Sequence, residues 1–370
     1  MLLFILLLIS STSTNYKAVL VAGSKDWENY RHQADVFHAY TELVRNDISP
    51  KDIILFAYND IAYNSLNPNP GNIINRPNGT NVFPGNESIN FSGDDVTPKN
   101  FLNTLKNLSD PNLNLLIYFT DHGSVGLLCF PNEYLYVDQL KEVILSLKYN
   151  SLFFIVEACE AGSMFQDWFP TNTHALVLAA TNYDKSSYAC YNDEFLDTYI
   201  ADCFSINLLE FLDTADTYIE SIGLLSKVIT NQTTTSPVTI YGDTRLFHTP
   251  LYKYWGKRVG GVSNSIKIKD KPVSSWDVPY YVGLKHKDIG IKDYNERLLY
   301  HWLKTYIPYN YSYKKIDTIC IRTCINQLKH CGITLNGYSN LFIKDIATLC
   351  YLKTDFYVKT LMENICNSYN

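Results

Sequence analysis

Five short apolar segments recur in the first half of the chain, separated by polar stretches of helical length. Each is apolar throughout instead of alternating between apolar and polar positions: 17–23 (KAVLVAG), 52–58 (DIILFAY), 113–120 (LNLLIYFT), 151–158 (SLFFIVEA) and 174–181 (HALVLAAT). Such runs are typical of strands buried on both faces of a parallel sheet, with helices outside. The pattern therefore predicts an α/β fold with a mostly parallel sheet.

The stretch between the first two apolar segments, residues 26–47, predicts a crossover helix that connects two parallel strands. Its apolar-facing positions at helical spacing are Ala34, Phe37, Thr41 and Val44. Residues 64–95 are instead rich in Pro, Gly and Asn. We expect a long surface loop there.

The pattern changes after residue 252. Residues 253–293 show little periodicity and contain many Gly, Ser and Lys residues, which indicates a linker. Residues 294–370 space their apolar positions three to four apart in four segments, which predicts a small helical domain. We therefore divide the chain into a leader at 1–13, an α/β domain at 14–252, the linker and the helical domain.

The leader, MLLFILLLISSTS, is an apolar run followed by small hydroxyl residues, which predicts a secretory signal peptide; a buried amino-terminal strand is the alternative. Six N-x-Ser/Thr sequons fit a secretory route as glycosylation sites: Asn78, Asn86, Asn90, Asn107, Asn231 and Asn310. No later segment has the ~20 apolar residues that a membrane span needs. We expect a protein of the secretory pathway without a span in its mature form.

Composition and charge narrow the choice of partners. The hydrophobic fraction of 46% provides for a sizeable core, and the net charge of −6 is spread without long runs of one sign. No basic patch or polybasic tract therefore suggests a nucleic acid or an anionic membrane surface as a partner. A small molecule or a polypeptide is the expected partner.

Nine cysteines are unevenly placed. Five crowd the helical segment, and in an oxidising compartment most of them should form disulfides. Their helical spacing favours bridges from Cys320 to Cys350 and from Cys331 to Cys366, with Cys324 outside both. The sequence alone leaves other pairings open, and the odd total leaves at least one thiol free or bonded to another chain.

Two of the predicted strands end in reactive side chains. His122 follows the strand at 113–120, and Cys159 follows the strand at 151–158. Ligands bind beyond the carboxyl ends of strands in an open parallel sheet, so both side chains face one cleft if their strands are neighbours. A thiolate can then attack a carbonyl carbon while the imidazolium protonates the leaving amine. The backbone N–H groups of Gly123 and Cys159 are candidates to face the developing oxyanion.

Each residue has a plainer interpretation when taken alone, because a buried Cys is usually a small hydrophobe and a lone His is usually a hydrogen-bonded core residue. Their shared position at the polar ends of two apolar strands favours catalysis. Metal binding is disfavoured, since no Cys or His pair in this region has ligand spacing. We expect no cofactor.

Longer stretches around these residues resemble one peptidase family. They run in order from residue 17 to about residue 210: VAGSKDWENYRHQADVFHAY, NDIAYNSLNPNPG, INRPNGTNV, DDVTPKNFL, YFTDHGSVG, FPNEYL, EACEAGSMF and SSYACYNDE. They closely resemble the legumain family, the asparaginyl endopeptidases among the C13 cysteine peptidases of clan CD. The helical segment with its spaced cysteines resembles the prodomain of that family. The resemblance implies a caspase-like fold.

By this resemblance, Cys159 is the nucleophile, His122 is the general base and then the general acid, and Asn29 helps to orient the histidine. Gly123 would supply an oxyanion amide. Asp121 matches an aspartate that the family can convert to a succinimide, and its plainer role is to hold the loop through hydrogen bonds.

The residues that match the family's substrate pocket are Arg31, His32, Glu157, Ser187 and Asp202. A pocket for an Asn side chain must donate to its carbonyl and accept from its amide, because either group buried unpaired costs ~1–3 kcal/mol. Arg31 and Asp202 on opposite walls would do both, and Asp would be accepted only when protonated, at acid pH. Without the resemblance, Arg31 beside a helix would be a solvated residue and Asp202 a capping residue.

The resemblance further implies a zymogen that cuts itself at acid pH, with the linker as activation peptide and the prodomain as intramolecular inhibitor. Candidate cleavage residues are Asn264, Asp288, Asp293 and Asn295. Implied partners are polypeptides with exposed Asn and cystatin-type inhibitors, and the implied location is the lysosome, a vacuole or the cell exterior. The alternatives are a transferase similar to GPI transamidase, an inactive secreted homologue that acts as a binding module, and peptide ligation at the same site.

Overall fold

The structure is a computed structural model that describes residues 15–260, 271–275, 277–278, 303, 316–333, 335 and 342–369. Several sequence predictions lie outside the described residues: the signal peptide, the sequon at Asn310, and the candidate cleavage residues Asn264, Asp288, Asp293 and Asn295.

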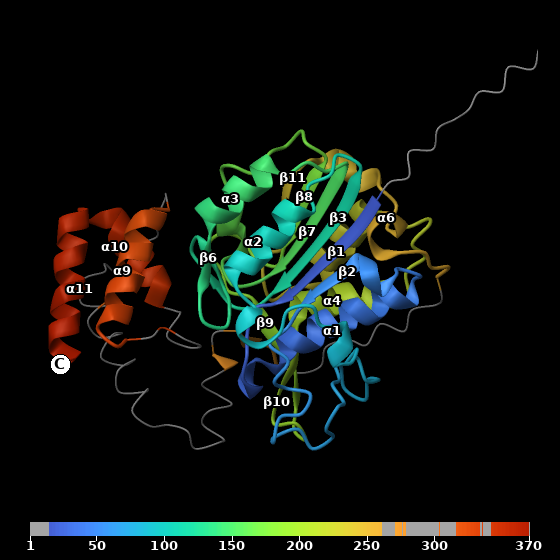
Figure 1. The fold of residues 1–370 in the computed structure, drawn as a ribbon, viewed down its shortest axis with the longest axis horizontal. Coiled ribbons are helices and arrows are strands. Elements are labelled where there is room, and N and C mark those ends of the chain that lie inside the picture. Colours follow the sequence, from blue (N-terminus) through green and yellow to red (C-terminus); the bar gives the residue numbers. More distant parts are fainter. Residues whose placement is uncertain are drawn as a thin grey trace, which may run out of the picture.

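A six-stranded sheet in the order β11-β8-β7-β3-β1-β2 forms the centre of the α/β domain (Figure 1). Five of its strands run parallel and are the five apolar segments of the sequence: β1 Asn15–Ala22, β2 Ile53–Phe56, β3 Leu113–Thr120, β7 Ser151–Glu157 and β8 Ala175–Ala179. The sixth, β11 (Thr239–Gly242), is antiparallel to β8 and only half-buried, so it lacks a continuous apolar signal. The predicted mostly parallel α/β sheet is confirmed.

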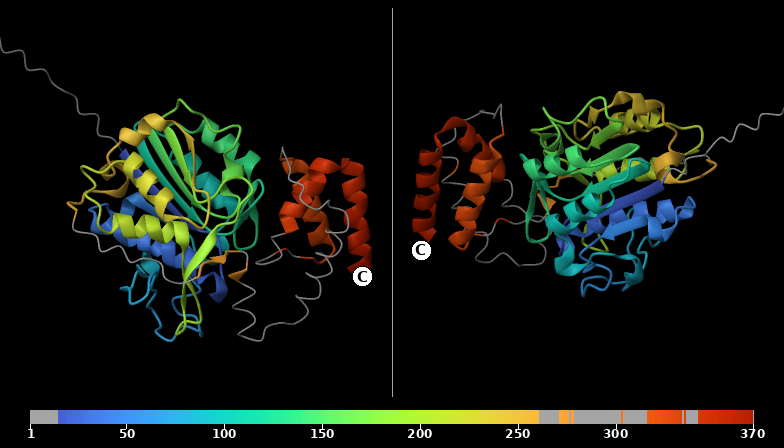
Figure 2. Two further views of the ribbon diagram at one scale, coloured as in Figure 1. Left: turned by 180° about the vertical axis from the view of Figure 1, so that it is seen from behind. Right: turned by 45° about the horizontal axis from the view of Figure 1, so that its top comes forward.

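Helices cover both faces of this sheet (Figures 1 and 2). Four lie on one face with Ala18 and Leu20 of β1 in a single core: α1 (Tyr30–Arg45), α4 (Cys203–Leu212), α5 (Ile222–Gln232) and α6 (Tyr252–Trp255). On the other face, Val19 and Val21 pack with α2 (Pro98–Asn107) and α3 (Val137–Ser146). Alternate residues of β1 therefore enter two cores, which explains why the strand is apolar at successive positions.

The helix predicted within residues 26–47 is α1, and it is more deeply buried than one apolar stripe implies. Ala34 and Phe37 are buried as predicted, whereas Val44 is 38% exposed. In its place the polar side of the helix is buried, including Arg31 and His32. Buried charges require partners, so the polar side of α1 must face other polar groups of the protein.

The segment predicted as a long loop, residues 64–95, is irregular apart from 3₁₀ helices at Asn86–Ser88 and Gly93–Asp95. It is not wholly on the surface, because Ile73, Asn75 and Val82 are buried. Short 3₁₀ helices elsewhere in the described chain are Trp27–Asn29, Pro50–Asp52, Ala161–Met164 and Thr244–His248.

Two small antiparallel sheets extend from the main sheet. One is β4-β5-β6, formed by Gly123–Ser124, Leu127–Cys129 and Tyr134–Tyr136. The other is β10-β9-β12, formed by Thr198–Asp202, Tyr188–Asp193 and Val273–Ser274. Strand β12 lies within the predicted linker, where β9 would otherwise present an edge with unpaired backbone groups. A part of the linker is therefore regular structure.

The C-terminal helices α9 (Thr318–His330), α10 (Phe342–Leu352) and α11 (Asp355–Tyr369) form a bundle beside β6 (Figures 1 and 2). Disulfides join Cys320 to Cys350 and Cys331 to Cys366, which are the pairs that the spacing favours. A third bridge, Cys190–Cys203, joins β9 to the start of α4 and was not predicted. No helix of the described residues combines the length and apolar character needed to cross a bilayer.

Candidate active site

Strands β3 and β7 carry the two candidate catalytic residues to one edge of the sheet. The strands remain paired up to Thr120 and Glu157, and His122 and Cys159 each follow this last pair by two residues. The two turns also touch, because a Cβ added to Gly123 would lie 2.6 Å from the carbonyl oxygen of Cys159. A residue with a side chain at Gly123 would push the two turns apart.

The backbone N–H of Gly123 is not used by the neighbouring sheet. The ladder bond between β4 and β5 runs from the N–H of Cys129 to the carbonyl of His122, at 3.0 Å. This bond makes Gly123 and Leu128 a non-hydrogen-bonded pair. The N–H group beside the Cys159 turn is thus available as an oxyanion donor.

The His122 ring is oriented by Asn29, which ends the 3₁₀ turn before α1. The Nδ2 of Asn29 donates to the carbonyl of Lys25 at 2.8 Å, so the amide turns its Oδ1 toward Nε2 of His122, also at 2.8 Å. Nε2 must therefore carry the proton, and the neutral ring has its lone pair on Nδ1. Burial, followed by the charge of Arg31, lowers the pKa of His122 well below its usual value, which keeps the ring neutral as a base requires.

The Cys159 thiol is fully buried and is contacted by Ser187, whose N–H donates to Sγ at 3.3 Å. Burial, followed by the charge of Glu160, raises the pKa of the thiol, while the contacts with Ser187 oppose the shift. The resting pair is thus a neutral thiol and a neutral imidazole. Nucleophilic attack then requires that a base take the thiol proton as the reaction proceeds.

Arg31 and Asp202 form a fully buried ion pair. Arg31 lies in the first turn of α1, and Asp202 is the last residue of β10. Nε of Arg31 donates to Oδ1 of Asp202 at 2.8 Å, and both side chains are wholly excluded from solvent. Asp202 begins α4 but forms no side-chain cap. Neither residue is the solvated or capping group that its local sequence suggests.

Three buried polar atoms around this pair make no hydrogen bond with any described residue: Nε2 of His32, Oε1 of Glu157 and Oδ2 of Asp202. The first and last approach to 3.4 Å without hydrogen-bond geometry. The other oxygen of Glu157 accepts from the N–H and hydroxyl of Ser205 at 3.1 and 3.2 Å. An unpaired buried polar group is costly. Their convergence is typical of a site that a polar ligand completes.

Asp121 braces the same region from the end of β3. Its Oδ1 lies 3.2 Å from Nδ1 of His32, which also contacts the hydroxyl of Ser24 at 2.7 Å. Burial raises the pKa of Asp121. The ligand atoms of His32, Asp121 and His122 lie within 4.8 Å of one another. Because Ser24 and Asn29 already engage one nitrogen of each ring, the cluster is built as a hydrogen-bonded frame instead of an open metal site.

Ser275, just after β12, occupies the space between Ser187 and the Arg31–Asp202 pair. Its N–H donates to the carbonyl of Ser187 at 2.9 Å, and its hydroxyl donates to Oδ1 of Asp202 at 3.2 Å. Nη2 of Arg31 lies 3.4 Å from its carbonyl oxygen. A segment from the predicted linker thus contacts both the thiol-binding Ser187 and the polar pocket.

The structure therefore gathers the predicted site residues into two connected groups. The first holds Asn29, Asp121, His122, Gly123 and Cys159, and the second holds Arg31, His32, Glu157, Ser187 and Asp202. Sequence reasoning missed Ser24, Ser205 and Ser275, which complete these contacts. Only Ser24 carried a usable signal, since it directly follows the apolar run of β1.

Comparison with known proteins identifies the family of the sequence. A family model described as the peptidase C13 family matches residues 16–257. Human legumain is 41% identical over 258 residues, which are 65% of this chain and 59% of that protein. The hemoglobinase of Schistosoma mansoni is 35% identical over 308 residues, covering 75% of this chain and 72% of that protein. The vacuolar-processing enzyme of Vicia sativa is 36% identical over 277 residues, covering 67% and 56%.

The extent of these matches defines the class of the protein, a peptidase family. The chain belongs to the peptidase C13 family. Its match to human legumain spans about three fifths of the length of that protein. Among solved structures, caspase-1 from Spodoptera frugiperda is similar with a TM-score of 0.38 and 12% identity over 67% of this chain and 94% of that chain. A likeness this distant adds no support to the family assignment.

Proposed function

We propose that the protein is a cysteine endopeptidase that cleaves peptide bonds on the carboxyl side of Asn. The observation that carries the proposal is the set of buried atoms of His32, Glu157 and Asp202 that make no hydrogen bond with a described residue. Asp202 is connected to the thiol of Cys159 through Ser275 and Ser187. An Asn side chain offers a carbonyl and an amide of matching polarity. Membership of a peptidase family and similarity to legumains support the same reaction.

In the proposed reaction, Nδ1 of His122 takes the proton of Cys159, and the thiolate attacks the carbonyl carbon of the substrate. The oxyanion that forms accepts from the N–H groups of Gly123 and Cys159. The imidazolium then protonates the leaving amine, and water activated by the neutral ring releases the acyl group. Asn29 keeps Nε2 engaged throughout, so that Nδ1 remains the reacting nitrogen.

The pocket also explains why Asp would be a conditional substrate. Arg31 would donate to the carbonyl oxygen of the substrate side chain, and Asp202 would accept from its amide. Protonated Asp can donate to Asp202 in the same way, whereas an ionised Asp would face its carboxylate. Gln is one methylene longer and would displace the polar contacts.

The test uses full-length protein activated at acid pH and peptides that differ only in Asn, Asp or Gln at one position. We expect cleavage after Asn, cleavage after Asp only at acid pH, and none after Gln. Cys159→Ala abolishes all cleavage, while Cys129→Ala, another buried cysteine outside the disulfides, retains it. Equal cleavage after Gln contradicts the specificity, and activity in Cys159→Ala contradicts the mechanism. Mass spectrometry of the products separates hydrolysis from ligation.

We also propose that the chain is made as a zymogen whose own linker blocks the site. Strand β12 pairs with β9, and Ser275 donates its N–H to Ser187 as an extended substrate would. Its carbonyl oxygen lies near Arg31 instead of the N–H of Gly123. The bound segment therefore fills the pocket without offering a bond to Cys159.

The C-terminal helices add a second contact to this block. Arg322 of α9 forms an ion pair with Asp138 at 2.7 Å and lies over the ring of Tyr136. Lys344 of α10 lies 3.7 Å from Glu160, the residue after the nucleophile. Each ion pair joins a carboxylate of the α/β domain to a cation of the C-terminal helices, and we propose that acidification releases this contact.

The secretory signal, the glycosylated sequons and a lysosomal, vacuolar or extracellular location belong to the same proposal. Five sequon asparagines are exposed: Asn78, Asn86, Asn90, Asn107 and Asn231. The three disulfides favour an oxidising compartment. Polypeptides with exposed Asn would be the substrates, and cystatin-type proteins would be inhibitors.

A further inference from the structure

A chain of hydrogen bonds runs behind the polar pocket to a charged cluster at the surface. It begins at Asp202, whose N–H donates to Oδ2 of Asp35 at 3.4 Å. Oδ1 of Asp35 accepts from Nδ2 of Asn75 at 2.7 Å, and Oδ1 of Asn75 faces Nδ1 of His38 at 2.8 Å. Nε2 of His38 lies 3.0 Å from Oδ1 of Asp213. All five side chains are buried.

The orientation of the Asn75 amide is fixed by its own donors. Nδ2 donates both to Asp35 and to the carbonyl of Ile200, at 2.9 Å. Both of these partners are acceptors, so the nitrogen must point to them and the oxygen must point to His38. Asn75 thus donates a hydrogen bond to β10 two residues before Asp202.

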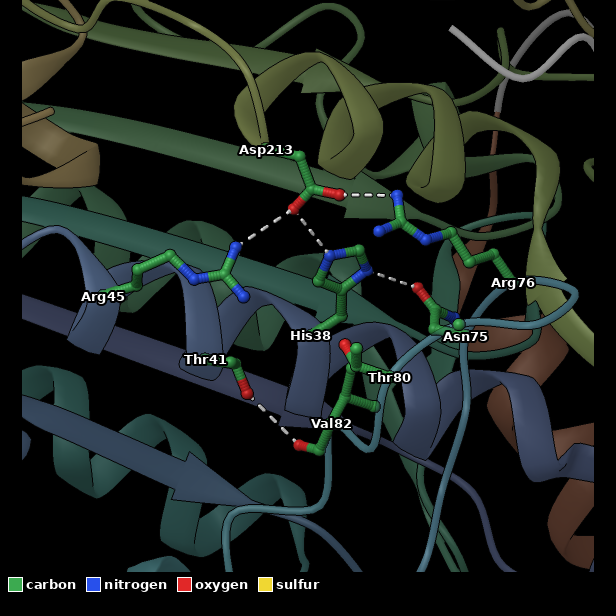
Figure 3. A pocket seen from close by; sticks show the side chains of 9 residues that line it. His38, Thr41, Arg45, Asn75, Arg76, Thr80, Val82 and Asp213 are labelled. Carbon is green, nitrogen blue, oxygen red and sulfur yellow. Dashed lines mark hydrogen bonds and ion pairs between the residues drawn. The ribbon is translucent and has the colours of Figure 1, made fainter. Parts of the chain in front are cut away.

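This orientation places an acceptor beside each nitrogen of the His38 ring. Nδ1 faces the amide oxygen of Asn75, and Nε2 faces Oδ1 of Asp213. The same Oδ1 lies 3.8 Å from Nη1 of Arg45, while Oδ2 accepts from Arg76 at 2.9 Å (Figure 3). Burial opposes the ionisation of Asp213, but its polar partners, His38 first among them, lower its pKa. His38 therefore bridges Asn75 and the carboxylate of Asp213.

The surroundings of His38 favour an ion-pair network over a bound metal. The charged groups that face it come from α1, the loop at 57–97, α4 and the segment after α6: Glu42, Arg45, Arg76, Glu210, Asp213 and Arg258. The ligand atoms of His38, Glu42 and Asp213 lie within 4.8 Å of one another. Arginines already pair with both carboxylates, so a cation would have to displace them. A small cavity of about 20 Å³ opens beside His38 and Thr41 (Figure 3).

We propose that His38 is a positioning residue for the substrate pocket. His38 contacts Oδ1 of Asn75, and Asn75 donates hydrogen bonds to Asp35 and to the carbonyl of Ile200. These contacts fix the position of Asp202. The inference rests on the proposed function, because Asp202 matters here as the acceptor for the substrate side chain. It adds a residue that touches neither substrate nor the reacting atoms.

His38→Gln can donate to Asn75 but lacks the ring that reaches Asp213. Asp213→Asn removes the carboxylate and leaves the ring in place. Asn75→Asp removes both donors to the pocket wall. Asn has two amide donors and Asp has none.

The kinetic test measures kcat and KM of the acid-activated enzyme for an Asn peptide at several pH values. We expect His38→Gln and Asn75→Asp each to raise KM about tenfold at acid pH with kcat changed less than about twofold. His248→Gln, which replaces an exposed histidine outside this hydrogen-bond network, should change neither constant.

An unchanged KM, or a fall in kcat as large as the rise in KM, overturns the inference, since general damage to packing would not be confined to KM. Hydrogen exchange of peptide 199–204 in the Cys159→Ala background is a readout without catalysis. We expect faster exchange in His38→Gln than in His248→Gln. Equal exchange overturns the inference even if no substrate is cleaved. Failure of the wild type to cleave Asn peptides overturns the proposed function alone. If His38→Gln does not fold, Asp213→Asn takes its place in both measurements.

Discussion

Nε of Arg31 and Oδ1 of Asp202 lie 2.8 Å apart in a pair from which water is excluded, although the residues are 171 positions apart in the chain. Helix α1 brings the cation and the end of β10 brings the carboxylate. Burial raises the pKa of Asp202, and Arg31 opposes that shift. Asp202 therefore depends on Arg31 to remain charged inside the protein.

Removal of one partner should destabilise the fold. Arg31→Met and Asp202→Leu are each expected to lower the free energy of unfolding by about 3–5 kcal/mol, because each strands a buried charge. For Arg31→Met the loss should be smaller at pH 5 than at pH 7, since Asp202 can then take up a proton. Urea unfolding in the Cys159→Ala background measures both.

The matched control is Lys17→Met. Its pair with Asp52 has the same 2.8 Å separation, but about 30% of each side chain is exposed. An exposed pair contributes less than about 1 kcal/mol. Equal losses for Lys17→Met and Arg31→Met would show that burial does not set the value of the Arg31 pair.

Replacement of Asn29 should separate orientation of the His122 ring from its basicity. Asn29→Ala removes the acceptor for Nε2 and is expected to lower kcat about tenfold to a hundredfold with little change in KM. Asn29→Asp places a carboxylate against the same nitrogen, which raises the pKa of His122. The acid limb of the kcat/KM profile should then move to higher pH. If Asn29→Asp lowers kcat as much as Asn29→Ala does and leaves the acid limb of the kcat/KM profile in place, the contact between Asn29 and His122 is contradicted.

The stability of the peptidase domain should fall as pH rises from 5 to 7.5. Burial raises the pKa of Asp35, Asp121 and Glu157 well above their usual values and that of Glu42 to about 7. The folded state keeps protons that the unfolded chain releases near pH 4. Stability from these groups is therefore complete below about pH 4 and is lost as pH rises toward the folded pKa values.

Two histidines oppose this trend over part of the range. Burial lowers the pKa of His32 and His122, so the unfolded chain gains their protons below about pH 6.5. Four acids outnumber two histidines, and above about pH 6.5 only the acids contribute. We expect Tm of Cys159→Ala to be about 5 °C higher at pH 5 than at pH 7.5. Glu42→Gln should make the difference in Tm between pH 5 and pH 7.5 smaller. A higher Tm at pH 7.5 than at pH 5 would contradict the expected direction of the change.

Disruption of β12 should expose the active-site thiol in the uncleaved chain. Ser275→Pro removes the N–H that donates to Ser187 and cannot continue the strand. We expect Cys159 to react with a thiol reagent at least about tenfold faster at neutral pH, because a transiently opened site reacts in proportion to its population. Ser274→Ala, a half-buried neighbour that keeps the backbone donor, is the control. Equal rates for Ser275→Pro and wild type would argue against a block by this segment.

The sheet and the positions of His122 and Cys159 after two of its strands were accessible from the sequence, because both depend on local pattern. Five continuous apolar runs gave five parallel strands, and the residues that follow two of them are His122 and Cys159. Strand β11 and the small sheets were missed, since a half-buried or two-residue strand has no distinct periodicity. The bridge Cys190–Cys203 was missed because no helical spacing links its members.

Burial of polar residues was the main failure of prediction from pattern. Val44 was placed on the buried face of α1 and is exposed, whereas Asp35 and His38 are buried. Asn75, within a segment expected at the surface, is buried as well. Their partners Asp202 and Asp213 lie more than 120 residues away, so only the fold could reveal them.

The antiparallel partnership of β9 with β12 has a consequence for target proteins. A polypeptide that replaces β12 must lie fully extended along this edge. Its main-chain groups there cannot be hydrogen-bonded to other parts of the same polypeptide. An asparagine inside a helix or a central strand cannot meet that demand, however well its side chain suits the pocket. The susceptibility of a target to cleavage will therefore depend on how readily the segment around the asparagine unfolds locally. A compact target becomes cleavable once acid pH destabilises it.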